Sequence, residues 1–69
     1  MSPNAIYAEL IRRDVRQTDV ARDLGLAPST VNNVVRGARK SRRVAERIAE
    51  IIETPFHVAF PEYVQNRRN

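Results

Sequence analysis

The sequence predicts an all-α fold, a compact domain of four to five short helices. Apolar residues recur at helical spacing in successive segments, and no segment alternates in the way that a β-strand requires. A proline or a capping residue stands where several of these segments begin. At 69 residues the chain is one domain, near the lower size limit for a self-sufficient core. We expect this domain to span residues 1–63, followed by a flexible polar tail at residues 64–69.

The first helix is expected from Pro3 to about Arg13. Ser2 is a suitable N-cap, and Pro3 fits the first helical position because its missing N–H would have no partner there. Asp14 to Arg16 then form a short connection. The side chains expected on the buried face are Ile6, Leu10 and part of Tyr7 or Ile11.

Residues 17–36 have the pattern of two short helices joined by a tight turn. Gly25 can adopt the positive φ that ends the first helix near Leu24. Pro28 suits the start of the second helix, which we expect to reach Arg36. The apolar positions at helical spacing are Val20, Ala21, Leu24, Leu26, Val31, Val34 and Val35. This is the pattern of a DNA-binding helix-turn-helix, and the alternative is a helical hairpin in some other small protein.

The polar side of the second helix in this pair favours the DNA-binding interpretation. Asparagine can bond adenine with two hydrogen bonds, arginine suits guanine or phosphate, and hydroxyls can donate or accept. Two adjacent asparagines also weaken a helix, which indicates a purpose other than helix stability. The residues predicted to contact bases are Ser29, Thr30, Asn32 and Asn33.

The positive charge is concentrated next to this helix. The chain has a net charge of +4, and residues 36–43 contain five basic residues and no acid. The other seven basic residues face eight acids, so the whole excess lies in this segment. A solvated surface or a nuclear-localisation signal would also explain such a run, but its position beside the helix favours phosphate contacts. The residues predicted to contact the DNA backbone are Gln17, Arg36, Arg39, Lys40, Arg42 and Arg43.

The remaining segments are expected to complete the core. Ser41 can cap a further helix that runs to about Glu53, with a stripe of valine, alanine and isoleucine. Thr54 and Pro55 repeat the cap-then-proline start and predict a single turn carrying Phe56, Ala59 and Phe60, with Phe60 closing the core. We expect Pro61 to end this turn and a polar tail to begin at Glu62.

Composition excludes several classes of protein. The chain has no cysteine and one histidine, which argues against a disulfide framework or a zinc site. No apolar run approaches the roughly 20 residues that span a bilayer, and no signal peptide is evident. No pairing of nucleophile and base, and no glycine-rich phosphate loop, indicates an enzyme. We therefore expect a non-enzymatic protein of the cytoplasm without cofactor, metal, small-molecule ligand or membrane partner.

The order of helices resembles the DNA-binding domains of lambda-repressor-like regulators. The stretch QTDVARDLGLAPSTVNNVVRGARKSRRVAERIAEII, followed by a Thr-Pro pair and a Phe-Pro-Glu end, is more similar to the Ner-like regulators of transposable phages. The resemblance covers about residues 3–63 and implies an all-α bundle and a small repressor of phage or prophage origin. Ala27 departs from it, because that family usually has a serine N-cap at this position.

Together these observations predict a sequence-specific double-stranded-DNA-binding transcriptional regulator. We expect it to repress by occupying an operator, through a recognition helix in the major groove. Two copies would bind an inverted repeat, with half-sites about 34 Å or a multiple apart. It would act in the cytoplasm of a bacterial host cell, associated with the nucleoid when bound. The alternative is a protein-interaction module, such as an antitoxin or anti-repressor.

Overall fold

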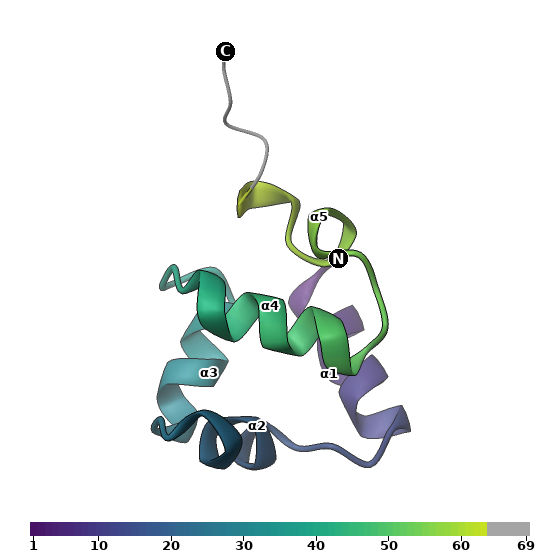
Figure 1. The fold of residues 1–69 in the computed structure, drawn as a ribbon. Helices are drawn as coiled ribbons and strands as arrows, with labels where there is room; N and C mark the ends of the chain where they lie inside the picture. Colours follow the sequence, from purple (N-terminus) through teal and green to yellow (C-terminus); the bar gives the residue numbers. More distant parts are fainter. Residues whose placement is uncertain (64–69) are drawn as a thin grey trace.

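The computed structural model describes residues 1–63, which form five α-helices and one 3₁₀ turn (Figure 1). Among these residues there is no β-strand, so the predicted all-α fold with a helix-turn-helix is confirmed. The expected tail at residues 64–69 lies outside the described part of the chain. The elements are α1 (Pro3–Arg12), α2 (Gln17–Leu24), α3 (Pro28–Val35), α4 (Arg42–Ile51), α5 (Phe56–Ala59) and η1 (Pro61–Tyr63).

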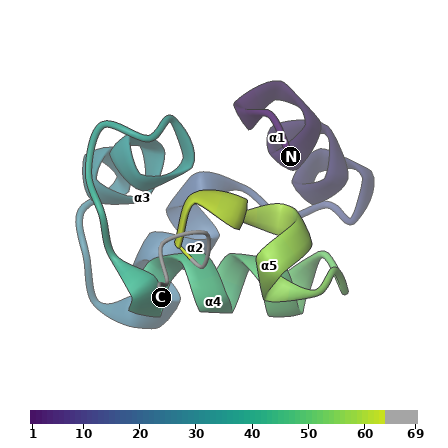
Figure 2. The same cartoon turned by 90° about the horizontal axis from the view of Figure 1, so that it is seen from above.

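The helices enclose one small apolar core. Helix α2 packs against α3, α4 packs against both, and α5 packs on α4. Seen from above, α1 and α3 lie on opposite sides of α2 (Figure 2). No polar residue is fully buried in the described chain. The buried side chains are Ile6, Leu10, Val20, Ala21, Val31, Val34, Val35, Val44, Ala45, Ile48, Ala49, Ile52, Ala59 and Phe60.

Helix α1 begins as predicted. The Oγ atom of Ser2 accepts a hydrogen bond from the backbone N–H of Ala5 at 3.1 Å, and Pro3 is the first helical residue. Of the two side chains considered for partial burial, Tyr7 packs against the core. Ile11 is 72% exposed. Tyr7 lies toward α3 and Ile11 lies toward solvent. Apolar spacing within α1 does not distinguish them, because it does not show where α3 lies.

The turn between α2 and α3 follows the predicted glycine signal. Gly25 has φ +70°, and no atom lies within 4 Å of the position a Cβ would occupy, so glycine is there for its backbone conformation. The N–H of Leu26 donates to the carbonyl of Ala21 at 2.8 Å, which closes a Schellman-type cap. This cap redirects the chain within three residues into α3.

Helix α4 is shorter than predicted. It ends at Ile51 instead of near Glu53, which itself has a positive φ of 55°. The predicted cap at Ser41 is confirmed, because its Oγ accepts from the N–H of Val44 at 3.4 Å. The residues at this end of α4 are Ile51, Ile52 and Glu53, and none of them is glycine. The sequence therefore gives little sign that the helix stops here.

The expected cap at Thr54 is wrong. Pro55 occupies the N-cap position of α5, and the Thr54 hydroxyl instead donates to the carbonyl of Ile52 at 3.1 Å. Glu62 is also not the start of a tail, since it lies within η1, which begins at Pro61 and places Tyr63 against Phe56 and Phe60. Phe60 itself is 1% exposed and closes the core as predicted.

The N-terminus is tied to this C-terminal segment. The Met1 amino group donates to the carbonyls of Val58 and Ala59 at 3.0 and 3.1 Å.

Within residues 1–63, none of the helices has the length and apolar character needed to cross a bilayer.

Candidate nucleic-acid interface

The outward face of α3 carries three polar side chains in one row. Val31, Val34 and Val35 are buried and fix the orientation of the helix. Ser29, Asn33 and Arg36 follow each other at spacings of four and three residues on the opposite side, and all are exposed. We call these three residues the outward row. It lies on the side of α3 opposite the three buried valines.

Thr30 and Asn32 lie at the two edges of the outward row. The 100° step of a helix places them on opposite sides of it, and both are half-buried. Of the four residues predicted to contact bases, Ser29 and Asn33 are therefore the exposed pair. Thr30 and Asn32 are exposed in part.

Asn32 is on the edge that faces α1, where it has a partner. The Tyr7 hydroxyl donates a hydrogen bond to Oδ1 of Asn32. Burial raises the pKa of Tyr7, and the positive charge of Arg36 lowers it by a smaller amount. The hydroxyl therefore stays protonated at neutral pH and remains a donor. This bond joins α1 and α3 through two residues that are 25 positions apart in the chain.

The start of α3 lacks a side-chain cap. Ala27 occupies the N-cap position with an extended backbone, and its side chain has no oxygen to accept a hydrogen bond. Only the carbonyl of Ala27 contributes, by accepting from the N–H of Thr30 at 3.0 Å. Pro28 has no N–H and the N–H of Thr30 is already bonded, so the backbone N–H of Ser29 keeps its donor capacity at this end of α3.

The basic segment folds back onto the end of α3. Gly37 has φ +82°, which turns the chain so that two N–H groups reach the carbonyl of Asn33. That carbonyl accepts from Ala38 at 2.9 Å and from Arg39 at 3.2 Å. The cationic loop therefore begins directly beside the outward row, as the order of residues in the sequence predicted.

The five cations of this segment are in two different situations. Within the described residues, the guanidinium groups of Arg36 and Arg39 have no hydrogen-bond or ion-pair partner, and both side chains are exposed. Each of the other three has a partner in the protein. Arg42 pairs with Glu46 at 2.8 Å and lies 4.7 Å from the centroid of the Phe56 ring. This pairing offsets part of the positive charge of Arg42.

The two remaining cations lie against carbonyl oxygens. Arg43 donates to the carbonyl of Leu24 at the end of α2, at 3.2 Å. Lys40 lies 4.7 Å from the centroid of the Tyr63 ring and 3.5 Å from the carbonyl oxygen of Glu62. All five cations remain on the surface, but within the described residues Arg36 and Arg39 are the two whose charged groups have no partner.

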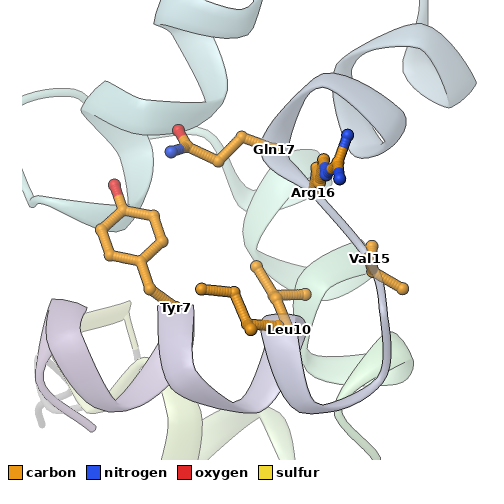
Figure 3. A pocket seen from close by; sticks show the side chains of 6 residues that line it. Tyr7, Leu10, Val15, Arg16 and Gln17 are labelled. Carbon is orange, nitrogen blue, oxygen red and sulfur yellow. The ribbon is translucent and has the colours of Figure 1, made fainter.

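Gln17 lies at the start of α2, where it lines an open pocket of about 190 Å³ between α1 and α2. In Figure 3 its carboxamide extends to the same side of the pocket as the Tyr7 hydroxyl, away from Val15 and Arg16. Because Tyr7 bonds to Asn32, this side is the one next to α3. The Gln17 carboxamide thus extends toward α3.

Two tyrosines near the site were not predicted as part of it. Tyr7 contacts Asn32, and Tyr63 accepts a hydrogen bond from the N–H of Ser41 in the basic loop. Tyr7 was considered only for its apolar ring, and Tyr63 was placed in the tail. The available signal was the hydroxyl, because a partly buried tyrosine usually finds a hydrogen-bond partner for it. The part of the chain that the structure describes has no cluster of three histidine or acidic side chains that could hold a metal.

The sequence model of a family described as winged helix-turn-helix DNA-binding matches residues 1–69. No curated protein and no solved structure matches the chain significantly. Since residues 1–63 contain no strand, they supply the helix-turn-helix of that description without a β-hairpin wing.

Proposed function

The chain belongs to the winged helix-turn-helix DNA-binding family, and we propose that it is a sequence-specific transcriptional regulator that represses by occupying an operator. Its partner is double-stranded DNA, as the family indicates. In the proposed complex α3 is the recognition helix and lies in the major groove. Ser29, Asn33 and the edge residues Thr30 and Asn32 contact bases.

The observation that carries this proposal is the exposed outward row beside a cationic loop. Base edges require donors and acceptors that are not already satisfied, and Ser29 and Asn33 provide them on a fixed helix. Phosphates require cations at the rim of the same surface, where Arg36 and Arg39 are unpaired within the described chain. Gln17, Lys40, Arg42 and Arg43 extend this rim.

A single copy offers one short recognition helix, which limits its affinity. We therefore propose that two copies bind an inverted repeat, with half-sites about 34 Å or a multiple apart on one side of the DNA. The similarity to Ner-like regulators supports a phage or prophage origin. The proposed site of action is then the DNA of a bacterial host, in its cytoplasm.

Selection of bound sequences from random duplex DNA tests the proposal, with the affinity of the selected site followed across salt concentration. We expect a two-fold symmetric motif and an affinity that falls steeply with salt, as phosphate contacts require. A matched control is a duplex of the same length and composition with a scrambled motif.

Two results would reject the regulator function. One is equal binding to selected and scrambled duplexes at low ionic strength. The other is tight association with a protein that persists at high salt while duplex binding is absent, which would favour the interaction-module alternative, whose interface would be mainly apolar.

A further inference from the structure

The hydrogen bond between Tyr7 and Asn32 limits what Asn32 can offer to a base. A carboxamide has an acceptor oxygen on one side and a donor NH₂ on the other. The Tyr7 hydroxyl lies on the α1 side of α3 and takes up Oδ1. Because the group is planar, its NH₂ is then directed away from Tyr7. Asn32 is therefore oriented before any DNA binds.

Tyr7 is well placed to hold this orientation. Its ring is partly buried and packs against the core. It also lines the pocket next to Gln17, so its hydroxyl lies where α1, α2 and α3 come together (Figure 3). Holding the side chain in advance reduces the entropy lost when it meets a base.

We propose that Tyr7 is a positioning residue that makes Asn32 a donor-only contact and so sets a preference for guanine at one base pair. The inference rests on the proposed function. In the major groove guanine presents two acceptors, N7 and O6, which suit an NH₂ group. Adenine presents an acceptor beside a donor, and bonding both requires Oδ1 as well as the NH₂. With Oδ1 turned toward Tyr7, the two-bond contact to adenine is lost.

The proposal predicts a change of specificity as well as a loss. In Tyr7→Phe the ring and its packing remain, but Oδ1 is released and Asn32 can rotate. The preference for guanine over adenine at that base pair should fall by about three- to tenfold, the range expected for one hydrogen bond. The other base pairs of the site and the salt dependence should stay the same, because no charge is removed.

The experiment compares selected sites for the unaltered protein, Tyr7→Phe, Asn32→Ala and the double variant. If Tyr7 acts through Asn32, both single variants alter the same base pair, and the double variant matches Asn32→Ala alone. Thr54→Val is the control, because it also removes one hydroxyl hydrogen bond but lies at the far end of α4 from α3. Its base preference should equal that of the unaltered protein.

A second measurement needs no DNA. The side-chain NH₂ resonances of Asn32 in the free protein should shift in Tyr7→Phe and not in Thr54→Val. Thermal unfolding of each variant confirms that it is folded at the temperature used.

The outcomes separate the two proposals. A motif that is identical in the unaltered protein and in Tyr7→Phe overturns the positioning role and leaves the regulator function intact. Uniform weakening on all sequences also overturns it, since Tyr7 would then contact the backbone. The absence of any motif with the unaltered protein rejects both, because sequence-specific binding itself would be missing.

Discussion

The backbone N–H of Ser41 donates a hydrogen bond to the hydroxyl of Tyr63 at 3.0 Å, which ties the basic loop to the C-terminal turn. The Tyr63 ring in turn packs against Phe56 and Phe60, with centroids 5.5 and 5.8 Å apart. Lys40 lies over the same ring. The aromatic cluster at the end of the described chain therefore supports the loop that we place beside DNA.

Tyr63→Phe should loosen this loop while keeping the aromatic packing. We expect a loss of about 1 kcal/mol in the free energy of unfolding, the usual contribution of one hydrogen bond. DNA affinity should fall on all sequences alike, since Lys40 and Ser41 lose a fixed position. Urea unfolding and duplex titration measure the two effects. Unchanged unfolding and affinity would show that the Tyr63 hydroxyl does not hold the loop.

Ala27→Ser should stabilise the protein. Ala27 is the N-cap of α3 with φ −73° and ψ 144°, a conformation that serine adopts at this position in other helices. The new hydroxyl can accept from a free N–H in the first turn, which contributes about 1 kcal/mol. Thermal unfolding measures the gain, and Ala27→Val, which adds volume without an acceptor, is the control. Equal melting temperatures for the serine and valine variants would contradict the expectation.

Arg39 and Arg42 should differ in their effect on salt dependence. Arg39→Ala removes a cation without a partner in the described chain and should reduce the salt slope by about one unit. Arg42→Ala should reduce it by less, because the Glu46 carboxylate at 2.8 Å already offsets the charge. Glu46→Gln should then raise affinity at low salt. Duplex titrations at several salt concentrations give the slopes, and equal slopes for the two alanine variants would rule out this role of Glu46.

Local sequence signals predicted most of the fold, because they act over a few residues. Ser2, Gly25 and Ser41 form the caps expected of them. The errors lie where the end of one helix decides how the next one begins. The Thr54 hydroxyl lies near the start of α5, which it was expected to cap, but it donates to the carbonyl of Ile52 instead. Its choice depends on where α4 stops, which no single residue signals.

The candidate site was predictable as a set of residues but not as an arrangement. The 3.6-residue period separates the outward row from the buried valines, so Ser29 and Asn33 could be identified from spacing alone. The contact between Tyr7 and Asn32 depends on how α1 crosses α3. It joins segments 25 residues apart, and no local pattern encodes that distance.

Acid should destabilise the protein partly through Asp19. Its carboxylate accepts from the backbone N–H of Arg16 at 2.9 Å, and this bond, together with the charge of Arg22, lowers the pKa of Asp19. A lowered pKa in the folded state gives stability that is present above the unfolded-state pKa and is lost as pH falls through the folded value. Asp19→Asn keeps an acceptor but does not titrate, so its unfolding should depend less on pH in the acidic range. Denaturant midpoints from neutral to acidic pH test this, and parallel curves for the two proteins would refute it.

Asn33→Ala should separate binding from stability. Asn33 is exposed in the outward row, and alanine has the higher helix propensity, so the free energy of unfolding should stay the same or rise by a few tenths of a kcal/mol. Affinity for the selected duplex should fall by about 1–3 kcal/mol, with the preference relaxed at one base pair. Competition binding against single-base variants of the site measures this, and circular dichroism follows the unfolding. Asn32 and Asn33 carry the only carboxamides on α3. If both can be replaced by alanine without any change in base preference, no carboxamide of α3 contacts a base.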